Sequence, residues 1–172
     1  MSDNFKIIKC PACQNEMVKV FIPSEGINLD ICLNGCGGIY FDNQEYKHFD
    51  EQDENIDEII EAIKDKVFIE VDENLPRTCP ACGAKMVKNF SSIKKEIQIE
   101  ECYSCGGKFL DNNELLKIRE EFATEQERSD AMMCFVYSTI GPEIKEAQMA
   151  RDAARAKRSL LRKLFDKLFD LN

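Results

Sequence analysis

The sequence of 172 residues contains a single histidine and no tryptophan. None of its apolar runs approaches the length of about 18 residues that a membrane-spanning helix requires, so the composition excludes such a helix. The first residues, MSDNFKIIKC, lack the apolar core of a secretory signal peptide. We therefore expect a cytoplasmic protein, in which clustered cysteines serve metal binding rather than disulfide formation.

Positive charge is also scarce over most of the chain. There are 32 acidic and 23 basic residues, for a formal charge of −9, and residues 1–130 carry −12 while residues 131–172 carry +3. Contacts with nucleic-acid phosphates need clustered Lys and Arg, so the acidic part disfavours direct binding of nucleic acid. Besides the basic residues of the tail, four lysines could supply such contacts: Lys85, Lys88, Lys94 and Lys95.

Cysteine, in contrast, is abundant, and eight of the nine cysteines fall into two groups of four. The groups are Cys10, Cys13, Cys32 and Cys36, and then Cys79, Cys82, Cys102 and Cys105. A shift of 69 residues superimposes C-P-A-C at 10–13 on C-P-A-C at 79–82, and C-G-G at 36–38 on C-G-G at 105–107. The chain therefore contains an internal duplication.

Each group has the spacing of a zinc site. Two cysteines separated by two residues can direct both sulfurs to one ion, and a second pair about 20 residues later completes a tetrahedron of thiolates. Such a tetrahedron has no open position, which is typical of structural zinc. We predict two zinc ions per chain, bound by these eight cysteines. Three residues separate Cys32 from Cys36, and we expect Gly35 to accommodate the longer turn.

Iron is the alternative metal. Four thiolates in knuckles of this type also resemble rubredoxin, which would make the chain an electron carrier. The three-residue gap after Cys32 and the absence of a matching aromatic shell disfavour this interpretation, and the colour of the protein would decide between the two metals.

The residues between the cysteine pairs predict short β-hairpins. Apolar side chains alternate at Ile27, Leu29 and Ile31 and again at Ile97 and Ile99, the period of a half-buried strand. The preceding runs Met17–Ile22 and Met86–Phe90 would supply the other strand of each hairpin. Because so small a unit has little apolar core, zinc binding would supply most of its folding free energy.

Each hairpin is followed by signals for a helix. Asp42 and Asp111 each precede a glutamate by three residues, a variant of the capping box that begins a helix. After the first hairpin and its helix signal, the acidic run 50–55 is expected to divide the helical pattern into two helices. Val67–Val71 is expected to form a short strand.

The motifs resemble a known family. The pattern C-P-x-C, a hydrophobic hairpin and C-x-x-C-G-G-x-aromatic-apolar-D-x-x-E resembles the small TFIIB-type zinc ribbon of many prokaryotic proteins. The second unit matches its ligands at Cys79, Cys82, Cys102 and Cys105 and its tail at Gly106, Gly107, Phe109, Leu110, Asp111 and Glu114. The first unit matches at Cys10, Cys13, Cys36, Gly37, Gly38, Tyr40, Phe41, Asp42 and Glu45, and departs only by the extra residue after Cys32. The resemblance implies zinc and a ribbon fold, and by analogy a role in transcription.

The last third of the chain has a helical pattern. Gly141-Pro142 predicts a turn, and apolar residues then recur at steps of three and four. Their positions are Ala147, Ala150, Ala154, Lys157, Leu161, Leu164, Leu168 and Leu171, of which only Lys157 is charged. We predict an antiparallel helical hairpin, in which the stripe on residues 143–171 mediates assembly within the chain, with a second copy or with a protein partner. A membrane surface is a further alternative, disfavoured by Asp166 and Asp170 on the basic face. Cys134 lies in an apolar run and is expected to be buried.

These patterns predict an α+β protein with two small β zinc ribbons, each followed by a helix, and a C-terminal helical hairpin. The expected parts are zinc ribbon 1 (1–45), an acidic helix/strand connector (46–76), zinc ribbon 2 (77–114) and a helical C-terminal region (115–172). Because we find no nucleophile–base set, phosphate-binding glycine loop or open metal position, we do not expect an enzyme. The favoured function is a non-catalytic zinc-binding adaptor, and the alternative is a nucleic-acid-binding, transcription-related protein.

Overall fold

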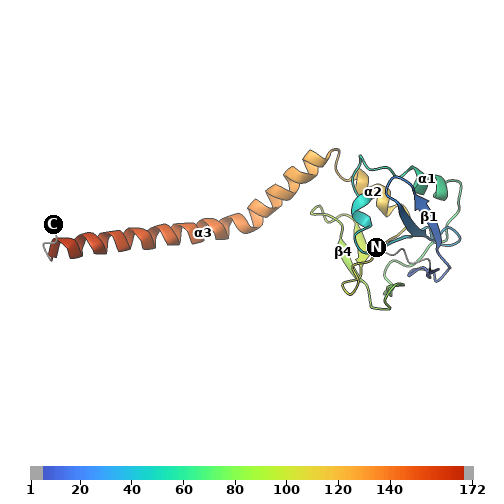
Figure 1. Cartoon of the computed structure of the whole chain (residues 1–172), viewed down its shortest axis with the longest axis horizontal. Helices are drawn as coiled ribbons and strands as arrows, with labels where there is room; N and C mark the ends of the chain where they lie inside the picture. Colours follow the sequence, from blue (N-terminus) through green and yellow to red (C-terminus); the bar gives the residue numbers. More distant parts are fainter. Residues whose placement is uncertain (1–5, 169–172) are drawn as a thin grey trace. The chain divides into compact units, whose positions relative to one another are not determined.

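The computed structural model describes the backbone of residues 6–168 and the side chains of residues 6–162. The chain divides into two units, Met1–Glu127 and Arg128–Asn172. The first unit combines six strands with short helices, and the second is helical, so the expected α+β class is confirmed (Figure 1).

The two expected hairpins form in the first unit. In ribbon 1, β1 (Val18–Ile22) pairs with β2 (Ile27–Ile31), and in ribbon 2, β4 (Val87–Phe90) pairs with β5 (Gln98–Glu101). A third strand follows the last cysteine of each ribbon, and these are β3 (Ile39–Phe41) and β6 (Lys108–Leu110). Each ribbon is therefore a three-stranded antiparallel unit rather than a hairpin alone.

The third strands join the two ribbons into a single sheet. The strand order is β1-β2-β3-β6-β5-β4, and the central pair β3–β6 is antiparallel. Tyr40 pairs with Phe109 at its centre, and these residues occupy equivalent positions of the 69-residue repeat. The flanking pairs Ile39↔Leu110 and Phe41↔Lys108 are exchanged by the same shift. The two ribbons are thus related by a local two-fold axis that passes between Tyr40 and Phe109.

The sheet separates two apolar clusters. Ile39 and Phe41 face one cluster, in which α1 (Asp57–Ile63) contributes Ile59 and α2 (Glu114–Glu120) contributes Leu115 and Ile118. Tyr40 points to the opposite face, into a cluster formed mostly by cysteines and aromatic rings. The alternation of neighbouring side chains in β3 therefore directs Tyr40 toward the cysteine groups.

A helix follows each ribbon, as expected, but Glu45 and Asn113 occupy the N-cap positions in place of Asp42 and Asp111. The backbone N–H of Asp42 donates to Glu45 Oε2 at 2.8 Å, and the N–H of Asp111 donates to Glu114 Oε2 at 2.7 Å. These bonds are one half of a capping box. The other half is absent, because the N–H of Glu45 and that of Glu114 donate to the backbone carbonyl oxygens of Asp42 and Asp111 and not to their side chains. The acidic run 50–55 divides the first helical pattern, as expected, into the 3-10 helix η1 (Tyr46–His48) and α1.

The prediction of a strand at Val67–Val71 is wrong. This segment has no regular secondary structure, and Val67 is 96% exposed. It is held instead by the N–H of Ile69, which donates to the carbonyl oxygen of Gly35 at 3.0 Å, and by the ring of Phe68, which lies against Gly37. Phe68 thus packs on the turn beside the first cysteine group, which the alternation in the sequence does not reveal.

The prediction of a C-terminal helical hairpin is also wrong. A single helix, α3 (Glu125–Leu168), contains Gly141 and Pro142 in its interior, and Figure 1 shows one helix that bends without a break. A proline removes one backbone hydrogen bond and bends a helix, but it ends the helix only where the rest of the sequence also favours a turn. Cys134 is exposed on α3, contrary to expectation. The side chains of Leu164, Leu168 and Leu171 lie outside the described residues.

Across the part of the chain that the structure describes, every helix falls short of the length or the apolar character needed to cross a membrane.

Candidate metal centres

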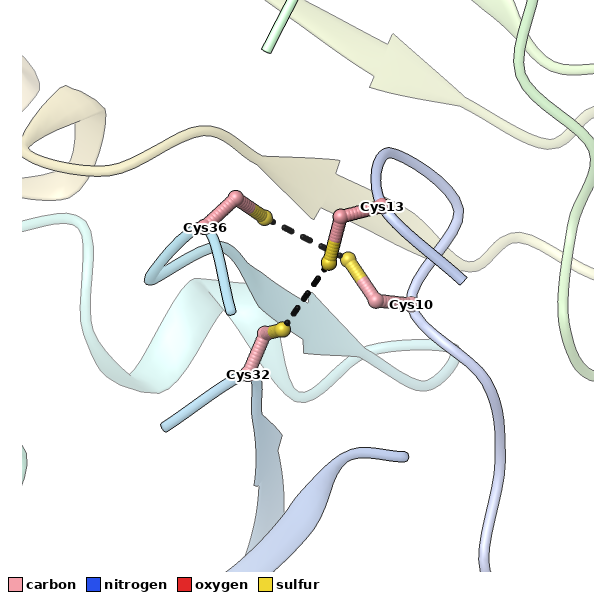
Figure 2. Close-up of side chains that lie close together, drawn as sticks. All are labelled: Cys10, Cys13, Cys32 and Cys36. Carbon is pink, nitrogen blue, oxygen red and sulfur yellow. Dashed lines mark hydrogen bonds between the residues drawn. The ribbon is translucent and has the colours of Figure 1, made fainter. Parts of the chain in front are cut away.

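The first cysteine group, Cys10, Cys13, Cys32 and Cys36, converges at the loop end of ribbon 1 (Figure 2). The sulfur of Cys10 lies 3.4 Å from that of Cys36, and the sulfur of Cys13 lies 3.3 Å from that of Cys32. All four sulfurs lie within 4.8 Å of one another. Residues that are up to 26 positions apart in the sequence thus form one compact cluster.

The second cysteine group, Cys79, Cys82, Cys102 and Cys105, repeats this arrangement in ribbon 2. The distance between the sulfurs of Cys79 and Cys105 is 3.5 Å, and that between Cys82 and Cys102 is 3.4 Å. These four sulfurs also lie within 4.8 Å of one another.

The two groups fit two zinc ions. A Zn–S bond of about 2.3 Å in a tetrahedron separates neighbouring sulfurs by about 3.8 Å, close to the distances found here. The sulfurs are too far apart for disulfides, whose S–S bond is about 2.05 Å long. Four thiolates without an open position match structural zinc.

Tight turns bring the first pair of cysteines in each group together. The N–H of Cys10 donates to the carbonyl oxygen of Asn15, and the N–H of Cys79 donates to that of Ala84, both at 2.8 Å. The turn needs a left-handed residue after the second cysteine, supplied by Gln14 (φ 64°) in ribbon 1 and by Gly83 (φ 75°) in ribbon 2.

Gly35 accommodates the longer spacing between Cys32 and Cys36, as expected, and the reason is space. A Cβ atom on Gly35 would lie 2.7 Å from the sulfurs of both Cys13 and Cys32. Only glycine allows the extra residue to pass beside the sulfurs while all four remain together.

Burial and hydrogen bonds shift the pKa values of the cysteines of each group in opposite directions. The hydrogen bond with Cys10 lowers the pKa of Cys32 to about 4, while the pKa of Cys10 is raised. In the second group, burial raises the pKa of Cys105 to about 12, and a hydrogen bond from the backbone of Ala84 lowers the pKa of Cys82 to about 7. Zinc must displace the protons of these thiols, so its affinity rises with pH.

The two groups differ in their exposure to solvent. Cys10, Cys32 and Cys36 are buried in the first group, whereas Cys82 is exposed and Cys105 partly exposed in the second. A chelator or an oxidant therefore reaches the second group more easily.

The hydroxyl of Tyr40 provides a polar contact to the second group. Tyr40 belongs to ribbon 1, yet its Oη lies 3.2 Å from Cys79 Sγ and 3.9 Å from Cys105 Sγ. Burial, together with the contact to Cys79, raises the pKa of Tyr40 well above its usual range. The phenol therefore remains protonated and is able to donate to a thiolate.

A buried ion-pair cluster lies beside the second group. Arg77 is 3% exposed, and its guanidinium donates two parallel hydrogen bonds to Asp111, at 2.8 and 2.6 Å. Its Nε lies 3.0 Å from Glu100 Oε1, a distance typical of an ion pair, although the N–H direction does not make it a hydrogen bond. The guanidinium also lies over the ring of Phe109, 5.0 Å from the ring centre. Burial raises the pKa values of Glu100 and Asp111 despite this cation.

The structure brings together all eight cysteines of the expected site and leaves Cys134 outside both groups. The roles of Tyr40 and Arg77 are not among those predicted from the sequence. A comparison of the two repeats could have singled out both residues, because Tyr40 aligns with Phe109 and Arg77 aligns with Ile8. A polar side chain in one repeat, at a position where the other repeat has an apolar side chain, indicates a contact that the other repeat lacks.

Comparison with protein-family models gives two matches to one model, Zn_ribbon_TFIIB, described as a transcription factor zinc-finger. The matched residues are 9–51 and 78–121, which together make up half of the chain and include every cysteine of both groups. No curated protein and no solved structure matches the chain.

Proposed function

The chain belongs to the family of TFIIB-type zinc ribbons, and on that basis we propose that it is a non-catalytic adaptor protein. The eight cysteines of the two groups are the ligands of two structural zinc ions, and α3 carries the surface through which the protein assembles. Closed sites of four thiolates support a structural rather than a catalytic role for the metal. A colourless protein with two zinc atoms per chain fits this proposal, whereas visible absorption from iron–thiolate bonds would favour the electron carrier.

The observation that carries the adaptor proposal is an exposed apolar seam along α3. Because α3 is continuous, the residues before and after Pro142 lie on one helix. The seam residues on both sides of Pro142 follow one another at alternating steps of three and four residues. The described seam consists of Met133, Val136, Ile140, Ala147, Ala150, Ala154 and Leu161, with Glu143 and Lys157 at its two charged positions. All seven apolar side chains are exposed within the chain.

This spacing supports self-association as a coiled coil. Alternating steps of three and four average 3.5 residues, the repeat with which two helices wind around each other. In a parallel pair, Glu146 of one copy would lie beside Arg151 of the other at the flanking positions, an attractive combination. The alanines at 147, 150 and 154 would allow close approach of the two backbones. Glu143 and Lys157 would weaken the seam and fix its register, as single polar core positions do.

We expect Ile140→Asp/Leu161→Asp to abolish self-association, because each copy would bring two carboxylates into the seam. The measurement is the mass in solution by light scattering. Gln148→Asp/Ser159→Asp is the matched control, since it adds the same charge at exposed positions of α3 off the seam. A wild-type chain that is monomeric at high concentration, or a seam variant with the wild-type mass, would contradict self-association through this seam.

The second candidate, direct nucleic-acid binding, is supported by the description of the family. The first unit carries a charge of −12, however, and two of the four candidate lysines have internal partners. Lys88 Nζ lies 3.6 Å from Glu100, and Lys94 Nζ contacts the carbonyl oxygen of Glu121 and the ring of Phe122. These contacts leave little free positive charge on ribbon 2 for phosphates.

We therefore expect a fragment of residues 1–127 to bind neither duplex DNA nor RNA with a Kd below about 10 μM at physiological salt, as measured by fluorescence anisotropy. The full chain serves as the comparison, because α3 adds Arg151, Arg155, Arg158 and Arg162. Micromolar binding by the fragment with a steep salt dependence would place the nucleic-acid candidate ahead of the adaptor. Neutralising Lys85 and Lys95 would then locate the contact.

A further inference from the structure

The local two-fold axis between β3 and β6 exchanges the central aromatic rings of the two ribbons. Tyr40 of ribbon 1 crosses to the second cysteine group, where a Cβ on Gly107 would collide with its hydroxyl. Phe109 of ribbon 2 crosses to ribbon 1, where a Cβ on Gly38 would collide with the tip of its ring. Each ribbon thus places an aromatic ring against the other ribbon, and each glycine leaves the space for it.

The two crossing rings differ by one hydroxyl group. The hydroxyl of Tyr40 lies within hydrogen-bond distance of Cys79 Sγ, and both residues are 1% exposed. Phe109 has no polar atom to offer to the first group. The equivalence of Cys10 with Cys79 in the repeat makes Cys10 the sulfur that lacks the corresponding donor.

We propose that Tyr40 is a positioning residue of the second metal centre, and that its hydrogen bond to Cys79 makes the two zinc sites of the chain inequivalent. This inference rests on the proposal that each cysteine group holds zinc. A metal-bound thiolate is only an acceptor, so the phenol is the donor. Zinc with four thiolates carries a net charge of about −2, and a buried donor stabilises that charge where water has no access.

The hydrogen bond predicts how each site responds to a change of one atom. Groups that hydrogen-bond to metal ligands typically change metal affinity by about 10–100-fold. Tyr40→Phe should therefore weaken zinc binding at the second site by about 10-fold and leave the first site unchanged. Phe109→Tyr should strengthen binding at the first site, because the local symmetry directs the new hydroxyl toward Cys10. The double variant Tyr40→Phe/Phe109→Tyr should reverse the order of the two affinities.

The test is NMR of the full chain loaded with cadmium-113 in place of zinc. The wild type should give two cadmium resonances, assigned by their couplings to the Cβ protons of the cysteines. Tyr40→Phe should shift the resonance of the second site alone, and Phe109→Tyr should shift that of the first site alone. Equilibrium competition with a zinc chelator supplies the two affinities, and the two phases of zinc release supply the rates.

Tyr103→Phe is the matched control. It removes a hydroxyl near the same metal centre, from a residue between Cys102 and Cys105, but Tyr103 is exposed and its hydroxyl contacts Asn89 rather than a sulfur. It should shift neither resonance. If Tyr40→Phe leaves the second resonance and its release rate unchanged, or alters both sites equally, the positioning role is wrong. A wild-type chain that binds fewer than two cadmium ions would instead contradict the zinc proposal itself, so the two failures are distinguishable.

Discussion

Replacing Cys79 with serine should cost the protein the zinc ion of the second group and unfold ribbon 2. Structural zinc contributes about 10–16 kcal/mol of apparent binding free energy in small ribbons and fingers, and a site with three thiolates loses much of it. Strand β4 of ribbon 2 has little apolar packing of its own to hold it, because its residues are mostly exposed. Metal analysis should return one zinc atom per chain in place of two.

The effect should extend into ribbon 1. Ile99 and Leu110 of ribbon 2 belong to the same apolar cluster as Ile39 and Phe41 of ribbon 1, and β6 covers the edge of β3. Loss of ribbon 2 would expose both the edge and the cluster, so the melting temperature of the remaining ribbon should also fall. Cys134→Ser is the control, since that thiol is exposed and lies outside both groups. Retention of two zinc atoms and of the wild-type melting temperature by Cys79→Ser would show that this cysteine is no ligand.

Arg77→Met is the second change for which we expect a large effect. It should lower the free energy of unfolding of the zinc-loaded protein by about 3–5 kcal/mol, the usual cost of removing one partner from a buried ion pair. Glu100 and Asp111 would remain buried without their main cation, although Lys88 stays 3.6 Å from Glu100. Urea unfolding at pH 7 with zinc in excess measures this difference.

Two controls separate the buried charge from the loss of a long side chain. The triple variant Arg77→Met/Glu100→Gln/Asp111→Asn removes all three charges and should recover much of the lost stability. Lys64→Met breaks an exposed ion pair with Glu61 and should change stability by about 0.5 kcal/mol or less. If the triple variant is as unstable as Arg77→Met, the cost lies in packing and not in uncompensated carboxylates.

The cysteine groups and their hairpins could be predicted because their information is local. A C-P-A-C turn fixes two sulfurs within four residues, and strict alternation identifies the strands that carry the other pair. The pairing of β3 with β6 could not be predicted in the same way. Each strand has only three residues, and its partner is the equivalent strand of the other repeat, 69 positions away, so nothing local distinguishes pairing within the chain from pairing with another chain.

The errors have a common physical cause. Gly141-Pro142 is a strong turn signal, yet residues on both sides favour a helix and α3 continues through it. Val67–Val71 has the composition of a strand, yet its backbone is bonded to the turn at Gly35. In both cases a local preference of about 1–3 kcal/mol is outweighed by the neighbouring structure. Arg77 and Tyr40 were missed because their partners are distant in the sequence.

The pairing of β3 with β6 also bears on which amino-acid substitutions each half of the sheet can accept. Two separate copies of one ribbon could meet edge to edge in the same way, but every residue on the axis would then face its own twin. Two copies of ribbon 1 would place Tyr40 against a second tyrosine, and two copies of ribbon 2 would carry Arg77 and its burial cost in both halves. Carrying both halves on one polypeptide removes that constraint, since a substitution in one half no longer repeats itself in the other. The tyrosine–phenylalanine and arginine–isoleucine differences are what such freedom permits: a symmetric framework whose two metal sites can be adjusted one at a time.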